Sequence, residues 1–389
     1  MDQVKNPFAP GAGTFPPELA GRESIINDAL INIKRASIGN NCRSQMYLGL
    51  RGVGKTVLLN KIEDIAKEQG HITTFIEADE KIDLKEVLYK EIQQVLKKLS
   101  TVELVKQEVN RGWAVLKSFL SNFEISFGEL SVQVDPEIGT ADSGRLEADL
   151  SQLFLTIGEL AQKANKPWSL LIDEVQYLNK EDLSALIVAL HKCNQKSVPI
   201  LIFGAGLPLL AAMSGDAKSY AERLFLYPQI GALSEEDANL AIRRPINNLG
   251  ENISSSALRL IYKRTRGYPY FLQEWGAEVW ACAKDGVEIN HDDVEMATKA
   301  VLHNLDEGFF KVRIDRLTNA EKEFVIAMSS LSGNSYKISS IAEKLHKETK
   351  QLSLIRANII KKGMIYSPSH GELAFTVPLF ADYLQRNYS

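Results

Sequence analysis

Hydrophobic residues along the first 233 positions of the chain form two alternating patterns. Short, almost unbroken apolar runs predict strands that are buried on both faces. These runs cover residues 44–48, 71–77, 169–173 and 199–203. Before and between these runs, apolar residues recur every three or four positions and predict helices over about 23–37, from Lys55 onwards, 145–165 and 180–193. Strands that alternate with helices indicate an α/β fold whose parallel sheet is covered on both faces.

The stretch from about residue 80 to 145 has a different pattern. Apolar spacing predicts two amphipathic helices, near residues 84–99 and 102–120. Partial alternation over residues 123–134 then predicts a small hairpin. We therefore interpret the stretch as an insertion in the α/β core. Its cations Lys97, Lys98, Lys106 and Arg111 fit either a partner surface or an ordinary solvated face.

The strand pattern stops near residue 234, and this defines the predicted domains. Residues 1–233 form the core, 234–316 a helical domain, and 317–389 a third domain. The third domain has three helical patterns followed by two short β-like runs, an order typical of a winged helix-turn-helix. The helices are expected near 319–331, 338–345 and 350–362, and the β-like runs at 364–366 and 373–377.

Composition excludes several classes of protein. A formal net charge of −4 argues against a uniformly basic nucleic-acid coat, although one basic surface remains compatible with it. The three cysteines, Cys42, Cys193 and Cys282, have neither metal-site nor disulfide spacing, so reduced thiols in a cytoplasmic protein are expected. The start of the chain lacks the apolar core of a signal peptide. The most apolar stretch, 198–213, is interrupted by glycine and proline and predicts a strand and turn, not a membrane span.

A glycine-rich segment lies between the predicted strand at 44–48 and the helix that begins at Lys55. Residues 49–56, GLRGVGKT, match the pattern G-x-x-x-x-G-K-[ST] without deviation. The glycines allow backbone N–H groups to surround phosphates, and the helix N-terminus adds partial positive charge. Lys55 would reach the β- and γ-phosphates of a nucleoside triphosphate, and the Thr56 hydroxyl would bind Mg²⁺. The candidate nucleotide contacts in this loop are Gly49, Arg51, Gly52, Val53, Gly54, Lys55, Thr56 and Val57.

Two acidic residues end the predicted strand at 169–173. A carboxylate at the end of a buried apolar strand is costly unless it meets a cation. Asp173 is therefore a candidate Mg²⁺ ligand, and Glu174 a candidate base that activates the attacking water. The alternative is a surface turn, but the loop upstream favours the nucleotide site.

These motifs make the chain similar to the AAA+ ATPases, in the branch that holds the origin-recognition initiators and the STAND-type archaeal ATPases. The resemblance covers nearly the whole chain. It rests on residues 6–8 with 16–23, on 51–56, on 172–178 and on 204–208, and the first two of these sets are the specific ones. Residues 267–273 and 371–378 extend it. It implies a P-loop NTPase core with a parallel sheet, an all-α lid and a winged-helix domain, with ATP or ADP and Mg²⁺ as cofactors.

The resemblance also implies residues farther from the loop. Leu19 and Arg22 would lie near the adenine and ribose, and the turn at Pro269 would close over the nucleotide. A proline that simply starts a helix is the alternative for that turn. Arg223 occupies the place of an arginine finger that reaches a neighbouring subunit's γ-phosphate. Arg264 and Arg266 are candidates for a lid arginine. An exposed salt bridge is the alternative for all three arginines.

The chain departs from the family pattern in one place. The strand after the Asp-Glu motif often ends in a polar residue that senses the γ-phosphate, whereas here Phe203 is followed by Gly204, Ala205 and Gly206. No side chain there can contact phosphate. We expect slow hydrolysis, or a backbone group in the sensor's place.

Basic residues on the third helix of the predicted winged-helix domain suggest contact with duplex DNA. Lys350, Arg356, Lys361 and Lys362 would contact phosphates, and Gln351, Ser353 and Asn358 could reach base edges. The alternative is a solvated polar face on a helix whose isoleucines form a core. The presumed wing tip, residues 367–372, has no Lys or Arg, which weakens the DNA interpretation.

The leading hypothesis is an ATP-dependent, DNA-associated AAA+ ATPase of the cytoplasm, whose nucleotide state controls its shape and assembly. Its partners would be ATP, duplex DNA, and a second copy or an effector protein, with no membrane. The first rival is a STAND-type signalling switch without DNA binding. The second is an accessory ATPase of a transposition or phage-defence system.

Overall fold

The computed structural model describes residues 1–389 except 12, 122–133, 370 and 389. The chain divides into two compact units, each described by itself. The sheet unit comprises residues 22–49 and 55–230. The helical unit comprises residues 1–21, 50–54 and 231–389. The middle residues of the glycine-rich loop therefore group with the helical unit, whereas Lys55 and Thr56 belong to the sheet unit.

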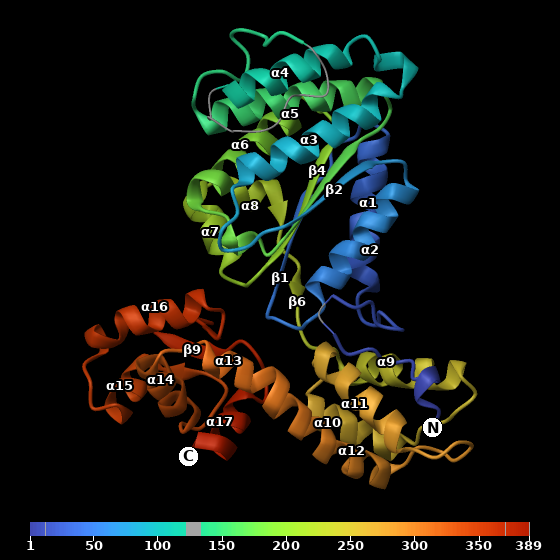
Figure 1. The fold of residues 1–389 in the computed structure, drawn as a ribbon, viewed down its shortest axis with the longest axis vertical. Coiled ribbons are helices and arrows are strands. Elements are labelled where there is room, and N and C mark those ends of the chain that lie inside the picture. Colours follow the sequence, from blue (N-terminus) through green and yellow to red (C-terminus); the bar gives the residue numbers. More distant parts are fainter. Residues whose placement is uncertain (12, 122–133, 370, 389) are drawn as a thin grey trace. The chain divides into compact units, whose positions relative to one another are not determined.

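The sheet unit is built on a six-stranded parallel sheet in the order β2-β3-β4-β1-β5, with β6 also paired to β1 (Figure 1). The strands are β1 (Ser44–Gly49), β2 (Ile72–Glu77), β3 (Trp168–Asp173), β4 (Ile200–Gly206), β5 (Phe225–Leu226) and β6 (Gln229–Ile230). The predicted α/β class is confirmed. The two shortest strands were not predicted, because two residues give no periodic pattern.

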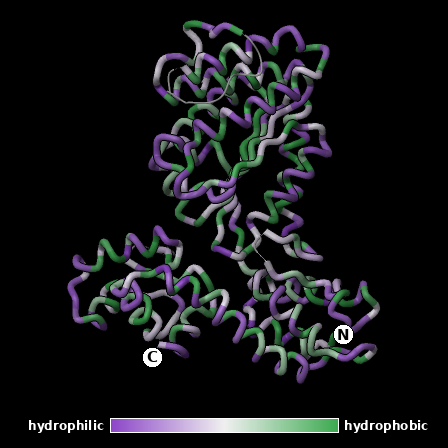
Figure 2. Tube along the Cα trace, in the orientation of Figure 1, coloured by the Kyte–Doolittle hydropathy of each residue, from purple (hydrophilic) through white to green (hydrophobic). Residues whose placement is uncertain are grey.

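Helices cover both faces of this sheet (Figure 1). One face carries α1 (Glu23–Ser37) and α2 (Lys55–Glu68), and the other carries the helices from α3 to α6. The remaining elements are α3 (Leu84–Ser100), η2 (Glu103–Val105), α4 (Val109–Ser121), α5 (Leu146–Lys163), η3 (Val175–Tyr177), α6 (Lys180–Gln195), α7 (Leu210–Ala217) and α8 (Ala221–Leu224). The strands are hydrophobic along most of their length, whereas hydrophobic and hydrophilic residues alternate along the helices (Figure 2).

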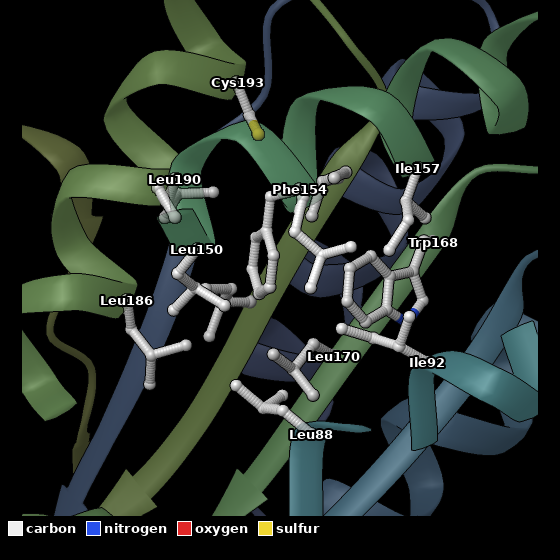
Figure 3. Packing of buried hydrophobic residues seen from close by; sticks show 14 of the residues in the cluster. Leu88, Ile92, Leu150, Phe154, Ile157, Trp168, Leu170, Leu186, Leu190 and Cys193 are labelled. Carbon is white, nitrogen blue, oxygen red and sulfur yellow. The ribbon is translucent and has the colours of Figure 1, made fainter. Parts of the chain in front are cut away.

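The core of the sheet unit lies between the sheet and the helices α3, α5 and α6. The rings of Phe154 and Trp168 meet edge to face with centroids 4.9 Å apart, and aliphatic side chains from the three helices surround them (Figure 3). Trp168 Nε1 donates to Thr74 Oγ1 at 3.1 Å, which satisfies its buried N–H.

The predicted insertion forms α3 and α4, which extend this core. Gly112 lets α4 approach closely, because a Cβ there would lie 2.6 Å from Leu96 Cδ2 and 3.0 Å from Leu160 Cδ1. The hairpin predicted over 123–134 falls outside the described residues, apart from Val134.

From residue 231 onwards, the helical unit begins with four helices. They are α9 (Glu235–Asn248), α10 (Ser255–Thr265), α11 (Pro269–Cys282) and α12 (His291–Asn304). A π-helix, Leu305–Phe310, and α13 (Lys311–Asp315) follow. The start of the chain also belongs here. It contains η1 (Gln3–Lys5), and Asn6 Nδ2 donates to the carbonyl of Ala277 at 3.1 Å. Phe8 packs on α11 at Gly276, where a Cβ would lie 2.6 Å from its ring, so the start of the chain is docked on this helix.

The last part of the helical unit combines four helices with a three-stranded antiparallel sheet in the order β7-β9-β8. Its elements are α14 (Asn319–Ser329), β7 (Tyr336–Lys337), α15 (Ile338–Lys344), η5 (Thr349–Leu352), α16 (Ser353–Lys361), β8 (Ile365–Tyr366), β9 (Glu372–Phe375) and α17 (Phe380–Tyr388). The helix predicted over 350–362 is thus a 3-10 turn followed by an α-helix. Strand β7 and helix α17 were not predicted.

Side-chain caps fix where several helices begin. Thr318 Oγ1 accepts from the Glu321 N–H at 3.4 Å, and Glu321 Oε2 accepts from the Thr318 N–H at 2.7 Å, which completes a capping box for α14. Asn179 caps α6 by accepting from the Asp182 N–H at 2.9 Å. Among the described residues, no helix has the length and apolar character needed to cross a membrane.

Candidate functional site

The glycine-rich loop connects the buried strand β1 to the first turn of α2. Gly52 and Gly54 have φ angles of 82° and 91°, a backbone conformation that side chains disfavour, so glycine is required at both positions. Lys55 is the first residue of α2 and is buried. Val53 and Val57 are also buried, which makes their backbone groups, not their side chains, the candidates for ligand contact.

Thr56 and Asp173 are brought together within the sheet unit. Thr56 Oγ1 donates to Asp173 Oδ2 at 2.5 Å, although the two residues are 117 positions apart in the sequence. Asp173 ends β3 and is 1% exposed. Burial raises the pKa of its carboxyl, the hydrogen bond from Thr56 opposes that effect, and the charge of Glu174 adds to it.

This pair of oxygen donors fits a magnesium ion. Carboxylate and hydroxyl oxygens are hard ligands, and Mg²⁺ in nucleotide sites usually takes one or two protein ligands besides phosphate and water. Within the described part of the chain, no three His, Cys, Asp or Glu side chains gather as an independent metal site. A divalent ion at Asp173 would also neutralise the buried carboxylate.

Glu174 follows directly, in a left-handed conformation with φ 53° and ψ 40°. Its N–H donates to Asp173 Oδ1 at 2.8 Å. Its carboxylate accepts a hydrogen bond from Nε2 of Gln176, whose Oε1 accepts from the Leu207 N–H at 3.0 Å. Gln176 was not singled out in the sequence. The only signal would have been its place two residues after Glu174.

Two of the last three residues of β4 are glycines, and their surroundings are crowded. A Cβ at Gly204 would lie 2.2 Å from Met46 Sδ, and a Cβ at Gly206 would lie 2.6 Å from Gln176 Oε1. Strand β4 therefore offers no polar side chain at its end. The polar side chain of Gln176 lies beside this end of the strand.

In the helical unit, the loop residues Arg51 and Gly52 contact the start of α11. The hydroxyl of Tyr268 donates to the Arg51 carbonyl, and the Tyr270 N–H donates to the Gly52 carbonyl at 3.2 Å. A Cβ at Gly52 would lie 3.0 Å from Tyr268 Cε1. Pro269 is the first residue of α11, and the loop contacts come from its two tyrosine neighbours.

The other predicted site residues are distributed over several elements. Leu19 belongs to the helical unit, and Arg22 immediately precedes α1 in the sheet unit. Arg223 is exposed on α8, and the structure records no ion pair for it among the described residues. By contrast, Arg264 pairs with Glu295 at 2.9 Å and Arg266 with Asp382 at 3.7 Å, as the salt-bridge alternative expected.

The basic residues near α16 have different environments. Lys350 and Lys361 are exposed and Arg356 is half-buried. Lys362 instead donates to Glu321 Oε2 at 2.6 Å and to the Arg316 carbonyl at 2.9 Å, so it belongs to a structural ion pair. Gln351 is also engaged, since its Oε1 accepts from the Glu348 N–H at 2.9 Å.

The cations of the insertion have the environment of a solvated face. Lys106 pairs with Glu103 at 3.4 Å, and Arg111 with Glu137 at 3.1 Å. Lys97 and Lys98 are exposed in the last turn of α3, where cations favour the helix dipole.

Comparisons with known proteins agree with this geometry. Residues 18–203 match the family model described as AAA ATPase domain, and residues 307–384 match a domain of unknown function, DUF8462. The solved structure of the Walker-type ATPase of Pyrococcus abyssi superposes with a TM-score of 0.60 at 16% identity, over 96% of this chain and 97% of that one. At that identity the likeness shows the fold alone.

Two curated relatives are each 23% identical. One is an uncharacterised HTH-type transcriptional regulator of Methanocaldococcus jannaschii, matched over 90% of this chain and 84% of that protein. The other is human adenylate cyclase type 10, matched over 66% of this chain but only 16% of that protein's length. The parallel sheet and the glycine-rich loop agree with the similarity of residues 18–203 to an AAA ATPase domain.

Proposed function

We propose that this chain binds ATP with Mg²⁺ and hydrolyses it slowly, and that its nucleotide state controls its shape, its assembly and its interaction with DNA or a partner. The hydrogen bond from Thr56 to Asp173 carries the proposal, because it places the two expected Mg²⁺ ligands within contact of one another. Lys55 would bind the β- and γ-phosphates and Glu174 would activate water.

The remaining assignments support the same scheme. The loop residues Gly49, Arg51, Gly52 and Gly54 would supply backbone N–H groups to the phosphates. Arg223, exposed and without a recorded ion pair in the described structure, would act on the nucleotide of a second copy. Residues 1–233 would be the ATPase core, 234–316 the lid and 317–389 the winged-helix domain.

DNA contact is supported by local charge in the last of these domains. Residues 337–362 hold seven Lys or Arg and only two Glu, in a chain whose net charge is −4. A basic stretch of this kind attracts the phosphate backbone. The archaeal relative that bears the name HTH-type transcriptional regulator points the same way.

A signalling switch of the STAND type, without DNA binding, is the second candidate. The observation that favours it is the end of β4, where Gly204 and Gly206 exclude a polar sensor. An accessory ATPase of a transposition or phage-defence system would share the same site and differ in its partner. A chain that retains ADP, binds no DNA and assembles only with a partner would favour the switch.

The test is to compare two variants with the parent in nucleotide binding and turnover. Lys55→Ala should lose ATP binding, and Glu174→Gln should bind ATP normally but lose turnover. Lys67→Ala is the matched control, because that lysine lies on the same helix, is itself exposed, and pairs with Glu63 at 2.8 Å. If both site variants hydrolyse ATP like the parent, the assignment of the site is wrong.

A further inference from the structure

We propose that Gln176 is a positioning residue, which holds the carboxylate of Glu174 for its reaction with water and takes the place of the polar side chain that β4 lacks. The inference rests on the proposed ATP hydrolysis and adds a residue to it. It follows from three observations within the sheet unit.

The first observation is that both ends of the Gln176 amide are engaged. Nε2 donates to Glu174 Oε2, and Oε1 accepts from the Leu207 N–H at 3.0 Å. Leu207 directly follows β4, so the amide links the candidate base to the end of that strand. A side chain fixed at two points orients its partner more precisely than one fixed at a single point.

The second observation is the space that the amide occupies. A Cβ at residue 206 would meet Gln176 Oε1 at 2.6 Å and Leu210 Cδ2 at 3.0 Å. The end of the Leu210 side chain can move aside, but the Gln176 amide oxygen is held by its hydrogen bond from the Leu207 N–H. Glycine at position 206 therefore keeps the room that the Gln176 amide needs.

The third observation is the fixed backbone of Glu174. The residue is left-handed, with φ 53°, and its N–H is bonded to Asp173 Oδ1 at 2.8 Å. The same Asp173 accepts from Thr56 through its other oxygen. A continuous set of hydrogen bonds thus runs from Thr56 through Asp173 and Glu174 to Gln176 and Leu207. With one Glu174 oxygen held by Gln176, the other is left to accept a proton from water.

The first test is Gln176→Leu, which keeps the size of the side chain and removes its polar atoms. The turnover rate kcat should fall by about 10- to 100-fold, while KM and ATP binding stay within about threefold. Gln195→Leu, at an exposed position on α6, is the control and should change neither. Far-ultraviolet circular dichroism confirms that both variants fold.

A second variant separates positioning from packing. Gln176→Glu keeps the acceptor for Leu207 and can donate to Glu174 only while protonated, because two adjacent carboxylates share a proton. Its kcat should approach that of the parent at low pH and fall as pH rises, whereas Gln176→Leu should be low throughout. Equal losses for both variants at every pH would overturn the inference in favour of a packing role.

The third test is a double-mutant cycle with Gly206→Ala. In the parent background, where Gln176 is present, the added methyl group should lower kcat about tenfold. In the Gln176→Ala background it should lower kcat no further, because the clashing amide is absent. Additive losses would contradict the coupling. If Gln176→Leu hydrolyses ATP as fast as the parent, this inference alone is overturned. If the parent itself does not hydrolyse ATP, the proposed function is overturned and the inference with it.

Discussion

Thr56 donates a 2.5 Å hydrogen bond to Asp173, and this contact joins the first turn of α2 to the end of β3. The acceptor is a carboxylate that is almost completely buried. Burial raises the pKa of this carboxyl, so its ionisation inside the sheet unit is less favourable than in water. Under the proposed function a bound Mg²⁺ would offset that cost, and the cost in the nucleotide-free protein can be measured.

Asp173→Asn should stabilise the nucleotide-free protein while it abolishes Mg²⁺-dependent turnover. Because the pKa of Asp173 is raised in the folded state, the folded protein loses stability as pH rises through that pKa. Asparagine does not ionise, so the variant has no such loss. We expect a gain of about 1 kcal/mol in the free energy of unfolding at pH 7, which shrinks as pH falls toward the ordinary aspartate value of 3.8. Urea unfolding in a metal chelator measures it, with the exposed Asp64→Asn as control. A variant less stable than the parent at pH 7 would contradict the argument.

His71 should make the sheet unit sensitive to acid. Burial lowers its pKa to about 4, and its ring contacts Ser37, Ser169 and the Ile33 carbonyl. The unfolded chain binds the proton near pH 6.5, so stability is lost as pH falls from about 6.5 toward 4. The expected loss at pH 5 is on the order of 2 kcal/mol. Unfolding of His71→Gln should show a flatter pH dependence, whereas exposed His303→Gln should keep the slope of the parent.

Lys362→Met should loosen the last domain. The Glu321 side chain is only 4% exposed, and Lys362 is its ion-pair partner at 2.6 Å. Loss of that partner leaves the buried carboxylate without a countercharge and with the Thr318 N–H as its remaining donor, at a cost of about 2 kcal/mol. Hydrogen exchange of the α14 amides should then accelerate by about 30-fold. Lys361→Met removes an exposed lysine next to it and should leave exchange unchanged; equal acceleration in both variants would rule out the ion pair as the cause.

Arg356→Ala should weaken DNA binding if α16 contacts a duplex. One lost phosphate contact lowers affinity several-fold at low salt and reduces the slope of log affinity against log salt by about one. Fluorescence anisotropy with a labelled 30-base-pair duplex measures both. Arg111→Ala, which removes an exposed arginine paired with Glu137, is the control. A parent chain that shows no salt-sensitive binding would favour the signalling switch instead.

The α/β class and the nucleotide motifs could be predicted because both depend on local spacing. Buried parallel strands require unbroken apolar runs, and the phosphate loop requires glycines at fixed intervals before Lys55 and Thr56. Helix α17 was also within reach, since Phe380, Tyr383 and Leu384 have helical spacing, but it was not predicted.

The roles of Gln176, Tyr268 and Lys362 could not be predicted in the same way. Each depends on a partner that the fold supplies: the Leu207 N–H, the Arg51 carbonyl, and the buried Glu321 carboxylate. Nothing in the periodicity of the chain specifies these pairings. Lys362 is an example. Its position in the sequence suggested contact with DNA, whereas in the structure it forms an ion pair with Glu321.

The crowding around Gly204 and Gly206 also limits how this chain could evolve. A polar residue at position 204 would collide with the Met46 sulfur, and one at 206 with the Gln176 amide. A conventional side chain at the end of β4 therefore requires the Met46 side chain or the Gln176 amide to move or to become smaller. A substitution at position 46 or 176 that comes first makes such a change easier, so the order of substitutions matters.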